Sequence, residues 1–213
     1  MISEIKSMAL ETGSETGRYR FKDSVYEALR IVERDKFVSS SLQPFAYDNR
    51  PLSIGYGQTI SQPYIVALMT DLLDLDPDDK ILEVGTGSGY QAAILSRIVK
   101  KVITVEIIEE LATSAKDRLK NLEYDNVSVY HGDGYYGFEQ EAPYDGIIVT
   151  SAAPRIPPSL LEQLRVNCKL VIPVGDPFHI QFLMLVEKGE KGIDVKNVLP
   201  VSFVPLTGDH GGH

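Results

Sequence analysis

Three glycines at alternate positions, Gly85, Gly87 and Gly89, carry the clearest chemical signal in this sequence. They follow the apolar run 81–84, which is typical of a buried strand, and they precede a segment with apolar residues at helical spacing. Glycines at such a turn let the backbone approach a ligand closely, because no Cβ collides with it. The pattern therefore predicts a nucleotide-type ligand here, with an ordinary glycine turn of another α/β protein as the alternative.

Two acidic residues flank this turn and indicate which ligand it binds. Glu83 lies inside the apolar run, and Glu106 ends the next one, at the distance (about 20 residues) that suits a carboxylate accepting ribose hydroxyls. The spacing G-x-G-x-G, with Tyr90 where a dinucleotide motif has glycine or alanine, disfavours a dinucleotide such as NAD. An acid inside the strand suits an ammonium group better than a pyrophosphate. We therefore expect S-adenosylmethionine, with Glu83 near its amino group and Glu106 at its ribose.

A second group of candidate residues lies in the segment 44–63, which has three prolines, two glycines and little periodicity. A long irregular segment with this much apolar surface is expected to fold over another part of the protein, and the glycine turn is the natural candidate. Thr59 and Ser61 come just before a helix predicted to begin at Gln62, with Pro63 in its first turn. Hydroxyls at that position can hold a carboxylate, although Ser61 can equally serve only as the N-cap of the helix.

Two further strand ends carry candidate binding residues. Asp133 lies between two glycines after the strand expected at 127–130, where an acid can reach a purine amino group, although Asp-Gly is also a common turn. Small residues at 151–154 follow the strand expected at 144–150. Open α/β sheets bind their ligands at such carboxyl ends of strands.

The elements around these residues predict an α/β fold. Strands alternate with helices through the middle of the chain and its end is rich in strands, which indicates a doubly wound, mostly parallel sheet with an antiparallel edge strand. At the N-terminus we expect a poorly held polar arm over 1–17 and then a helix over about 24–34, capped by Ser24. The last part should contain a short helix at 158–164 and strands at 169–173, 181–187 and 201–204.

Composition narrows the class of protein. The 213 residues suit a single domain, 1–213, in which 1–79 supply helices and a covering loop and 80–213 supply the cofactor-binding core. The net charge of −9, with no Lys/Arg run longer than two residues, argues against nucleic acid. A single cysteine, Cys168, fits a reducing cytoplasm. The four histidines lack metal-ligand spacing, and no apolar run has membrane-spanning length, so we expect a cytoplasmic monomer without metal or membrane partner.

Taken together, these stretches resemble the protein-L-isoaspartate O-methyltransferases. The resemblance extends from the helix around 25–38 to Thr207. It rests on three stretches, which are 54–63 (IGYGQTISQP), 82–91 (LEVGTGSGYQ) and 142–154 (APYDGIIVTSAAP). Many methyltransferases share the glycine stretch, whereas 54–63 is far more specific to this family.

The resemblance implies a Rossmann-like methyltransferase fold and a repair reaction. A methyl group passes from S-adenosylmethionine to the α-carboxylate of L-isoaspartyl residues in damaged proteins and peptides, and the ester then collapses to a succinimide. Ser61 resembles the residue usually proposed as catalytic. The implied cofactor-binding residues are Gln58, Thr59, Ile60, Glu83, Gly85, Thr86, Gly87, Ser88, Gly89, Glu106, Asp133, Gly134 and Thr207. The implied substrate-binding residues are Ser61, Ile54, Val149, Thr150, Ser151, Ala152 and Leu206.

Some positions depart from the family pattern, and other functions stay open. Ser53 replaces a common proline, Asn167-Cys168 replaces a Gly-Gly turn, and Ser151 replaces an alanine in the expected substrate wall, where it can alter peptide preference. One alternative is a methyltransferase acting on RNA or on a small molecule, which the acidic charge and the 59–63 stretch (TISQP) respectively disfavour. Another is a non-catalytic domain that only binds the cofactor, which the complete motif set disfavours.

Overall fold

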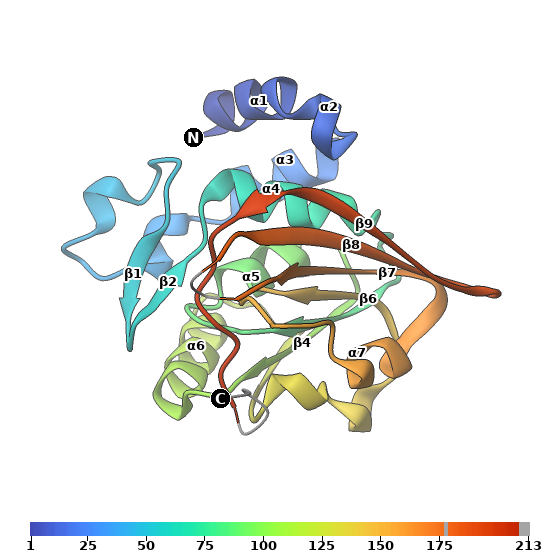
Figure 1. The fold of residues 1–213 in the computed structure, drawn as a ribbon. Helices are drawn as coiled ribbons and strands as arrows, with labels where there is room; N and C mark the ends of the chain where they lie inside the picture. Colours follow the sequence, from blue (N-terminus) through green and yellow to red (C-terminus); the bar gives the residue numbers. More distant parts are fainter. Residues whose placement is uncertain (177–178, 209–213) are drawn as a thin grey trace.

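The computed structural model describes residues 1–176 and 179–208, which form a seven-stranded sheet with helices on both faces (Figure 1). The strand order is β5-β4-β3-β6-β7-β8-β9. All pairings from β5 to β7 are parallel, whereas β8 pairs antiparallel with both β7 and β9. The expected doubly wound, mostly parallel sheet is therefore confirmed. Its strands are β3 (Lys80–Val84), β4 (Lys101–Glu106), β5 (Val127–His131), β6 (Tyr144–Val149), β7 (Leu164–Val174), β8 (Gln181–Gly189) and β9 (Gly192–Val201).

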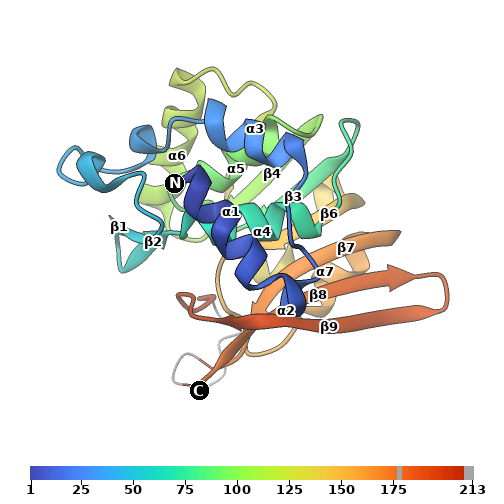
Figure 2. The ribbon, with the colours of Figure 1, turned by 90° about the horizontal axis from the view of Figure 1, so that it is seen from above.

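The central strand β3 is buried on both faces, as its apolar run predicts. Successive side chains of a strand point to opposite faces, so Ile81 joins one hydrophobic cluster while Leu82 and Val84 join the other. The first cluster packs against the N-terminal helices, which lie together on one side of the sheet in both views (Figures 1 and 2). Glu83 shares the face of Ile81. The helices after the N-terminal region are α4 (Pro63–Leu72), α5 (Tyr90–Ser96), α6 (Glu109–Asn121) and α7 (Pro158–Gln163).

The expected polar arm over 1–17 is wrong, because this segment folds into α1 (Ile2–Glu11) and α2 (Gly13–Thr16). Ile5 and Ala9 are fully buried, and the Thr12 hydroxyl lies 2.5 Å from the Tyr64 hydroxyl on α4. The physical reason is an apolar stripe at helical spacing that packs onto α4 and that the polar composition of the segment obscures.

The helix expected over about 24–34 is shorter than predicted. α3 (Asp23–Ile31) has Lys22 at its N-cap position and no side-chain cap, so Ser24 does not cap it. Because the chain leaves the helix at Val32, Arg34 falls in a separate 3₁₀ turn, η1 (Arg34–Phe37), and its side chain is fully buried.

The segment 44–63 lies over the glycine turn, as expected, but it is not irregular throughout. It contains the end of η2 (Gln43–Phe45) and the antiparallel hairpin of β1 (Leu52–Gly55) and β2 (Gln58–Ile60). Ile54 packs against Gly87, where its Cδ1 atom would lie 3.2 Å from a Cβ. The hairpin therefore covers the turn.

The strand expected at 201–204 is misplaced, because β9 ends at Val201 and the chain then leaves the sheet edge. Across residues 1–176 and 179–208, no helix combines the length and the apolar content that crossing a bilayer requires.

Candidate active site

The glycine turn joins β3 to α5 at the carboxyl ends of the parallel strands. Gly85 has a φ of 94°, and a Cβ there would overlap Oγ1 of Thr150, so the position requires glycine. Thr150, at the end of β6, donates a hydrogen bond from this hydroxyl to the Gly85 carbonyl at 2.6 Å. The Gly85 N–H donates to the carbonyl of Val105 on β4 at 2.8 Å. The turn is thus held between the ends of two neighbouring strands.

Glu106 holds the other side of the turn. One oxygen of its carboxylate accepts a hydrogen bond from the Gly87 N–H at 2.8 Å and the other accepts from the Ile108 N–H at 3.0 Å. The side chain is buried apart from an edge that lines a cavity. Each carboxylate oxygen has a second lone pair, so Glu106 can still accept hydrogen bonds from a ligand's hydroxyls.

Glu83 is the most unusual ionisable group of the site. It is fully buried, and within the described residues neither of its carboxyl oxygens has a hydrogen-bond partner that meets the usual geometry. The pKa of Glu83 is raised to about 8, and burial is the main cause. The charge of Glu106 adds a smaller increase, and the hydroxyl of Thr104 opposes the shift. A buried acid that has no counter-ion among the described residues, two positions before Gly85, fits a cationic ligand group and does not fit a pyrophosphate.

A narrow cavity lies where the turn, the hairpin and the strand ends meet. The predicted cofactor residues that line it are Gln58, Thr59, Gly85, Gly87, Glu106, Gly134 and Thr207. The predicted cofactor residues that do not line it are Ile60, Glu83, Thr86, Ser88, Gly89 and Asp133.

Those six residues lie around the cavity in other roles. Ile60 and Glu83 are buried, and the Thr86 hydroxyl lies 2.6 Å from that of Thr104. Ser88 faces a neighbouring groove, and Gly89 is the N-cap of α5. The Asp133 carboxylate accepts a hydrogen bond from the Tyr135 N–H at 3.0 Å and caps η3 (Gly134–Tyr136).

The segment after β9 closes the remaining side of this cavity. Its backbone pairs with Ala152, which donates to the Val204 carbonyl and accepts from the Leu206 N–H, both at 2.8 Å. The Gln181 side chain holds the backbone of Phe203 through two hydrogen bonds of 2.6 and 3.1 Å. Leu206 and Thr207 thereby reach the cavity wall.

A second, larger pocket of about 590 Å³ adjoins the first. Its polar end is formed by Ser61, Thr59 and Thr150, and the last two also line the narrow cavity. Ser61 does not cap a helix, because α4 begins at Pro63 with Gln62 at the N-cap position. The rest of the wall is mainly apolar and comes from α1, α4 and the region around the end of β9; it includes Met8, Ile65, Leu199, Val201 and Phe203.

The other predicted substrate residues lie elsewhere. Ser151 and Leu206 line the narrow cavity, whereas Val149 and Ala152 are buried and Ile54 packs on the glycine turn. The Ser151 hydroxyl is buried and unpartnered within the described residues.

Sequence reasoning missed three residues near these cavities. Met8 of α1 and Thr12, which follows that helix, line the larger pocket, and the apolar spacing of Ile2, Ile5 and Met8 was the signal that could have revealed the helix. Arg34 donates a hydrogen bond to the backbone carbonyl of Ser61, and no local pattern indicated it.

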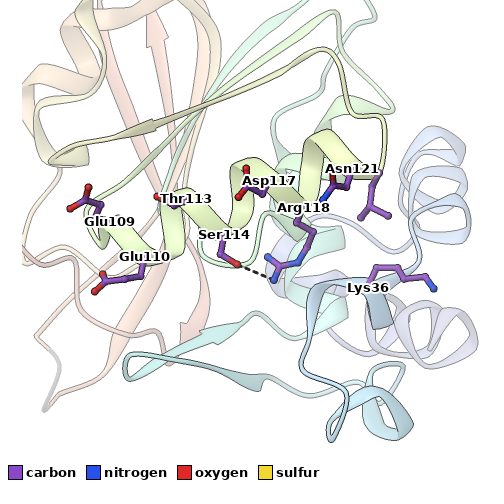
Figure 3. Close-up of a pocket in the computed structure, with 9 residues that line it drawn as sticks. Lys36, Glu109, Glu110, Thr113, Ser114, Asp117, Arg118 and Asn121 are labelled. Carbon is purple, nitrogen blue, oxygen red and sulfur yellow. Dashed lines mark hydrogen bonds between the residues drawn. The ribbon is translucent and has the colours of Figure 1, made fainter.

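A wide groove of about 890 Å³ runs along α6, with charged side chains pointing outward from the helix (Figure 3). Three of its lining residues are the acids Glu109, Glu110 and Asp117, and Arg118 donates to the Ser114 hydroxyl at 3.3 Å. None of the predicted site residues lines it. In the part of the chain that the structure describes, which excludes His210 and His213, no group of three or more His, Cys, Asp and Glu side chains could hold a metal ion.

The doubly wound sheet, the glycine turn with its buried acid and the paired cavities at the strand ends define a Rossmann-like methyltransferase that uses S-adenosylmethionine. Residues 7–211 match the family model of protein-L-isoaspartate(D-aspartate) O-methyltransferase. The chain belongs to this family and is an enzyme of isoaspartyl methylation.

Individual relatives agree with this assignment. A protein of Syntrophobacter fumaroxidans named protein-L-isoaspartate O-methyltransferase 2 is 54% identical over 99% of this chain and 85% of its own length. A solved protein-L-isoaspartate O-methyltransferase superposes with a TM-score of 0.86 at 27% identity, covering 99% of this chain and 67% of the other. A Plasmodium falciparum structure, described as such an enzyme in complex with S-adenosyl-L-homocysteine, has a TM-score of 0.76 at 28% identity, covering 95% and 97%.

Proposed function

We propose that the two adjoining cavities divide the reaction between methyl donor and methyl acceptor. The observation that carries this proposal is their shared boundary, because Thr59 and Thr150 line both. A methyl group that crosses this boundary moves from the narrow cavity over the glycine turn into the larger pocket, where Ser61 lies. The narrow cavity is then the S-adenosylmethionine site, and the larger pocket receives the α-carboxylate of an L-isoaspartyl residue.

The residues of the narrow cavity fit this cofactor. Glu83 does not line the cavity itself, but it precedes the lining residue Gly85 by two positions; it is a buried acid without a hydrogen-bond partner among the described residues and suits the amino group. Glu106 lines the cavity and has free lone pairs for ribose hydroxyls. The backbone of the glycine turn takes the methionyl end, since Gly85 and Gly87 line this cavity without a Cβ. Gly134 lies at the adenine side together with Asp133, and Thr207 closes over the bound molecule. S-adenosylmethionine supplies a methyl group that its sulfonium makes reactive.

The protein aligns the acceptor carboxylate and shields it from water, and it does not need to activate it chemically. A carboxylate is already ionised at pH 7, so the reaction needs no general base. Ser61 donates a hydrogen bond that orients the acceptor oxygen, and Thr150 keeps the glycine turn in register with it. The apolar wall of the pocket and the covering hairpin exclude water, which favours in-line transfer.

We further propose that residues 1–213 form one domain, which works as a monomer in the cytoplasm on isoaspartyl proteins and peptides and not on nucleic acid. The net charge of −9 supports the exclusion of nucleic acid, and the single cysteine supports the cytoplasmic location.

The test compares two matched peptides, one with isoaspartate and one with normal aspartate, and measures base-labile incorporation of label from S-adenosylmethionine. We expect incorporation into the isoaspartyl peptide alone. Ser61→Ala should lower kcat/KM roughly 10–100-fold, the effect of one oriented hydrogen bond to a charged group. Ser53→Ala, on the exposed part of β1, is the matched control and should change little. Full activity of Ser61→Ala would refute the role proposed for Ser61. Labelling of neither peptide would refute the isoaspartyl residue as the methyl acceptor.

A further inference from the structure

Arg34 is a buried cation that lies outside both cavities. Its side chain is fully buried, and within residues 1–176 and 179–208 no carboxylate lies within ion-pair distance of it. A buried charge that lacks a counter-ion lowers stability, and apolar side chains of similar volume often replace such groups without loss. The guanidinium must therefore do something that an apolar side chain would not.

Two of its hydrogen bonds reach the two ends of the covering segment. Nε donates to the carbonyl of Ala46 at 2.9 Å, and Nη2 donates to the carbonyl of Ser61 at 2.8 Å. Residues 46 and 61 lie on either side of the β1–β2 hairpin in the chain. The planar guanidinium, with donors in fixed directions, thus fixes both ends of the segment relative to each other.

The third contact reaches the glycine turn. The guanidinium carbon lies 4.7 Å from the centre of the Tyr90 ring, and Tyr90 is the first residue of α5, immediately after Gly89. Tyr90 is itself almost fully buried and packs edge-on against Phe37 at 5.4 Å. A cation over an aromatic face is attracted more strongly where both groups are desolvated, as they are here. One side chain therefore joins the backbone of Ser61 to the start of α5.

We propose that Arg34 is a positioning residue that sets the place of Ser61 relative to the glycine turn, and hence the alignment of the acceptor oxygen with the methyl group. The inference rests on the role proposed above for Ser61. Arg34 lines neither of the two cavities. It acts through the Ser61 backbone on one side and through Tyr90 on the other.

The first test uses Arg34→Met, which keeps the length of the side chain and removes the donors and the charge. We expect kcat on the isoaspartyl peptide to fall roughly 10–100-fold, because a shift of about 1 Å at an aligned acceptor costs that much. The KM for S-adenosylmethionine should change less than about threefold, since the lining of its cavity is kept. Arg34→Lys keeps the charge and one donor group and should recover part of the kcat.

Stability has to be separated from positioning. Asp74→Asn breaks the ion pairs of Asp74 with Arg18 and Lys169, which lie beyond the C-terminal end of α4, whereas Ser61 precedes its N-terminal end. It should lower the melting temperature and leave kcat unchanged. Equal losses of kcat in Asp74→Asn and Arg34→Met, or a kcat of Arg34→Met within about threefold of the parent, would overturn the inference.

A double-mutant cycle tests whether Arg34 acts through Ser61. The variant with both Arg34→Met and Ser61→Ala should have nearly the kcat/KM of Ser61→Ala alone. Once the Ser61 hydroxyl has been removed, a shift in its position can cause no further loss of activity. Additive losses would show that Arg34 acts by another route and would refute the proposal. Full activity of Ser61→Ala alone would instead refute the role of Ser61, and a loss in Arg34→Met would then refute the inference as well.

Discussion

The buried carboxyl of Glu83 predicts a variant that is more stable than the parent enzyme and binds its cofactor less well. Glu83→Gln keeps the size of the side chain but cannot ionise. In the cofactor-free enzyme the environment of Glu83 favours the neutral acid, because burial raises its pKa to about 8. The amide should therefore fit that environment at every pH, whereas the carboxylate fits it only once a cation is bound.

The size of the effect follows from proton linkage. Glu83 has a pKa of about 8 in the folded enzyme and an ordinary value of 4.5. Between these values the folded state holds a proton that the unfolded state has released, so stability falls as the pH rises. At about 1.4 kcal/mol for each pH unit, the loss is roughly 5 kcal/mol across the range and about 3 kcal/mol by pH 7. Glu83→Gln removes this loss.

The assay is thermal unfolding of the cofactor-free parent and variant between pH 5 and pH 8. At pH 7 the variant should melt roughly 6–12 °C higher, since about 1 kcal/mol corresponds to 2–4 °C in a chain of this size. The difference should shrink to roughly 2–3 °C at pH 5, which is close to the ordinary pKa of 4.5. A difference that is the same at both ends of this range would refute the reasoning, because it would not come from the ionisation of Glu83.

Cofactor binding completes this test. S-adenosyl-L-homocysteine is a suitable probe, because it has the same amino group as S-adenosylmethionine. Its Kd should rise about 10–100-fold in Glu83→Gln, from the loss of a hydrogen bond to a charged group. Binding to the parent at pH 7 should release a proton, which calorimetry in buffers of different ionisation enthalpy detects, and binding to the variant should release less. Equal proton release by the parent and the variant would show that the group that loses its proton on binding is not Glu83.

Three further variants probe the remaining surroundings. Ser151→Ala removes a buried, unpartnered hydroxyl from the narrow cavity, so it should raise the Kd of S-adenosyl-L-homocysteine roughly 3–10-fold, and an unchanged Kd would exclude a cofactor contact. Met8→Ala enlarges the acceptor pocket and should raise the KM for the peptide roughly 3–10-fold without changing that Kd; a change in both would show that α1 supports the whole site. Burial raises the pKa of Asp74, but hydrogen bonds from Lys169 and Arg18 outweigh it and hold the pKa below its usual value. Asp74→Asn should therefore lower stability at pH 7 by about 1 kcal/mol, and the difference should close as the pH falls below 3.8, whereas a difference that persists in acid would exclude this cause.

Local patterns predicted the central strands well. The apolar runs that became β3 and β4 lie between layers, so each residue is buried whichever face it points to, and a run of apolar letters is enough to identify them. The glycine turn was equally clear, because Gly85 sits where backbone geometry and the Thr150 hydroxyl leave room for no Cβ. The N-terminal helix was missed, since only a sparse apolar stripe distinguishes it from a polar tail.

The site divides in the same way. The sequence by itself determined the chemistry available at the strand ends. Glu83 and Glu106 lie within β3 and β4, and the glycines follow β3 directly, so their places follow from the places of these strands. Only the tertiary structure decided that Thr59 and Thr150 form a common boundary, that Ser151 lines the narrow cavity, and that Met8 lines the larger pocket. It alone also brought Arg34 against the Ser61 carbonyl, 27 positions further along the chain. Such contacts depend on how separate elements pack, and packing between distant segments leaves no periodic signal in a single sequence.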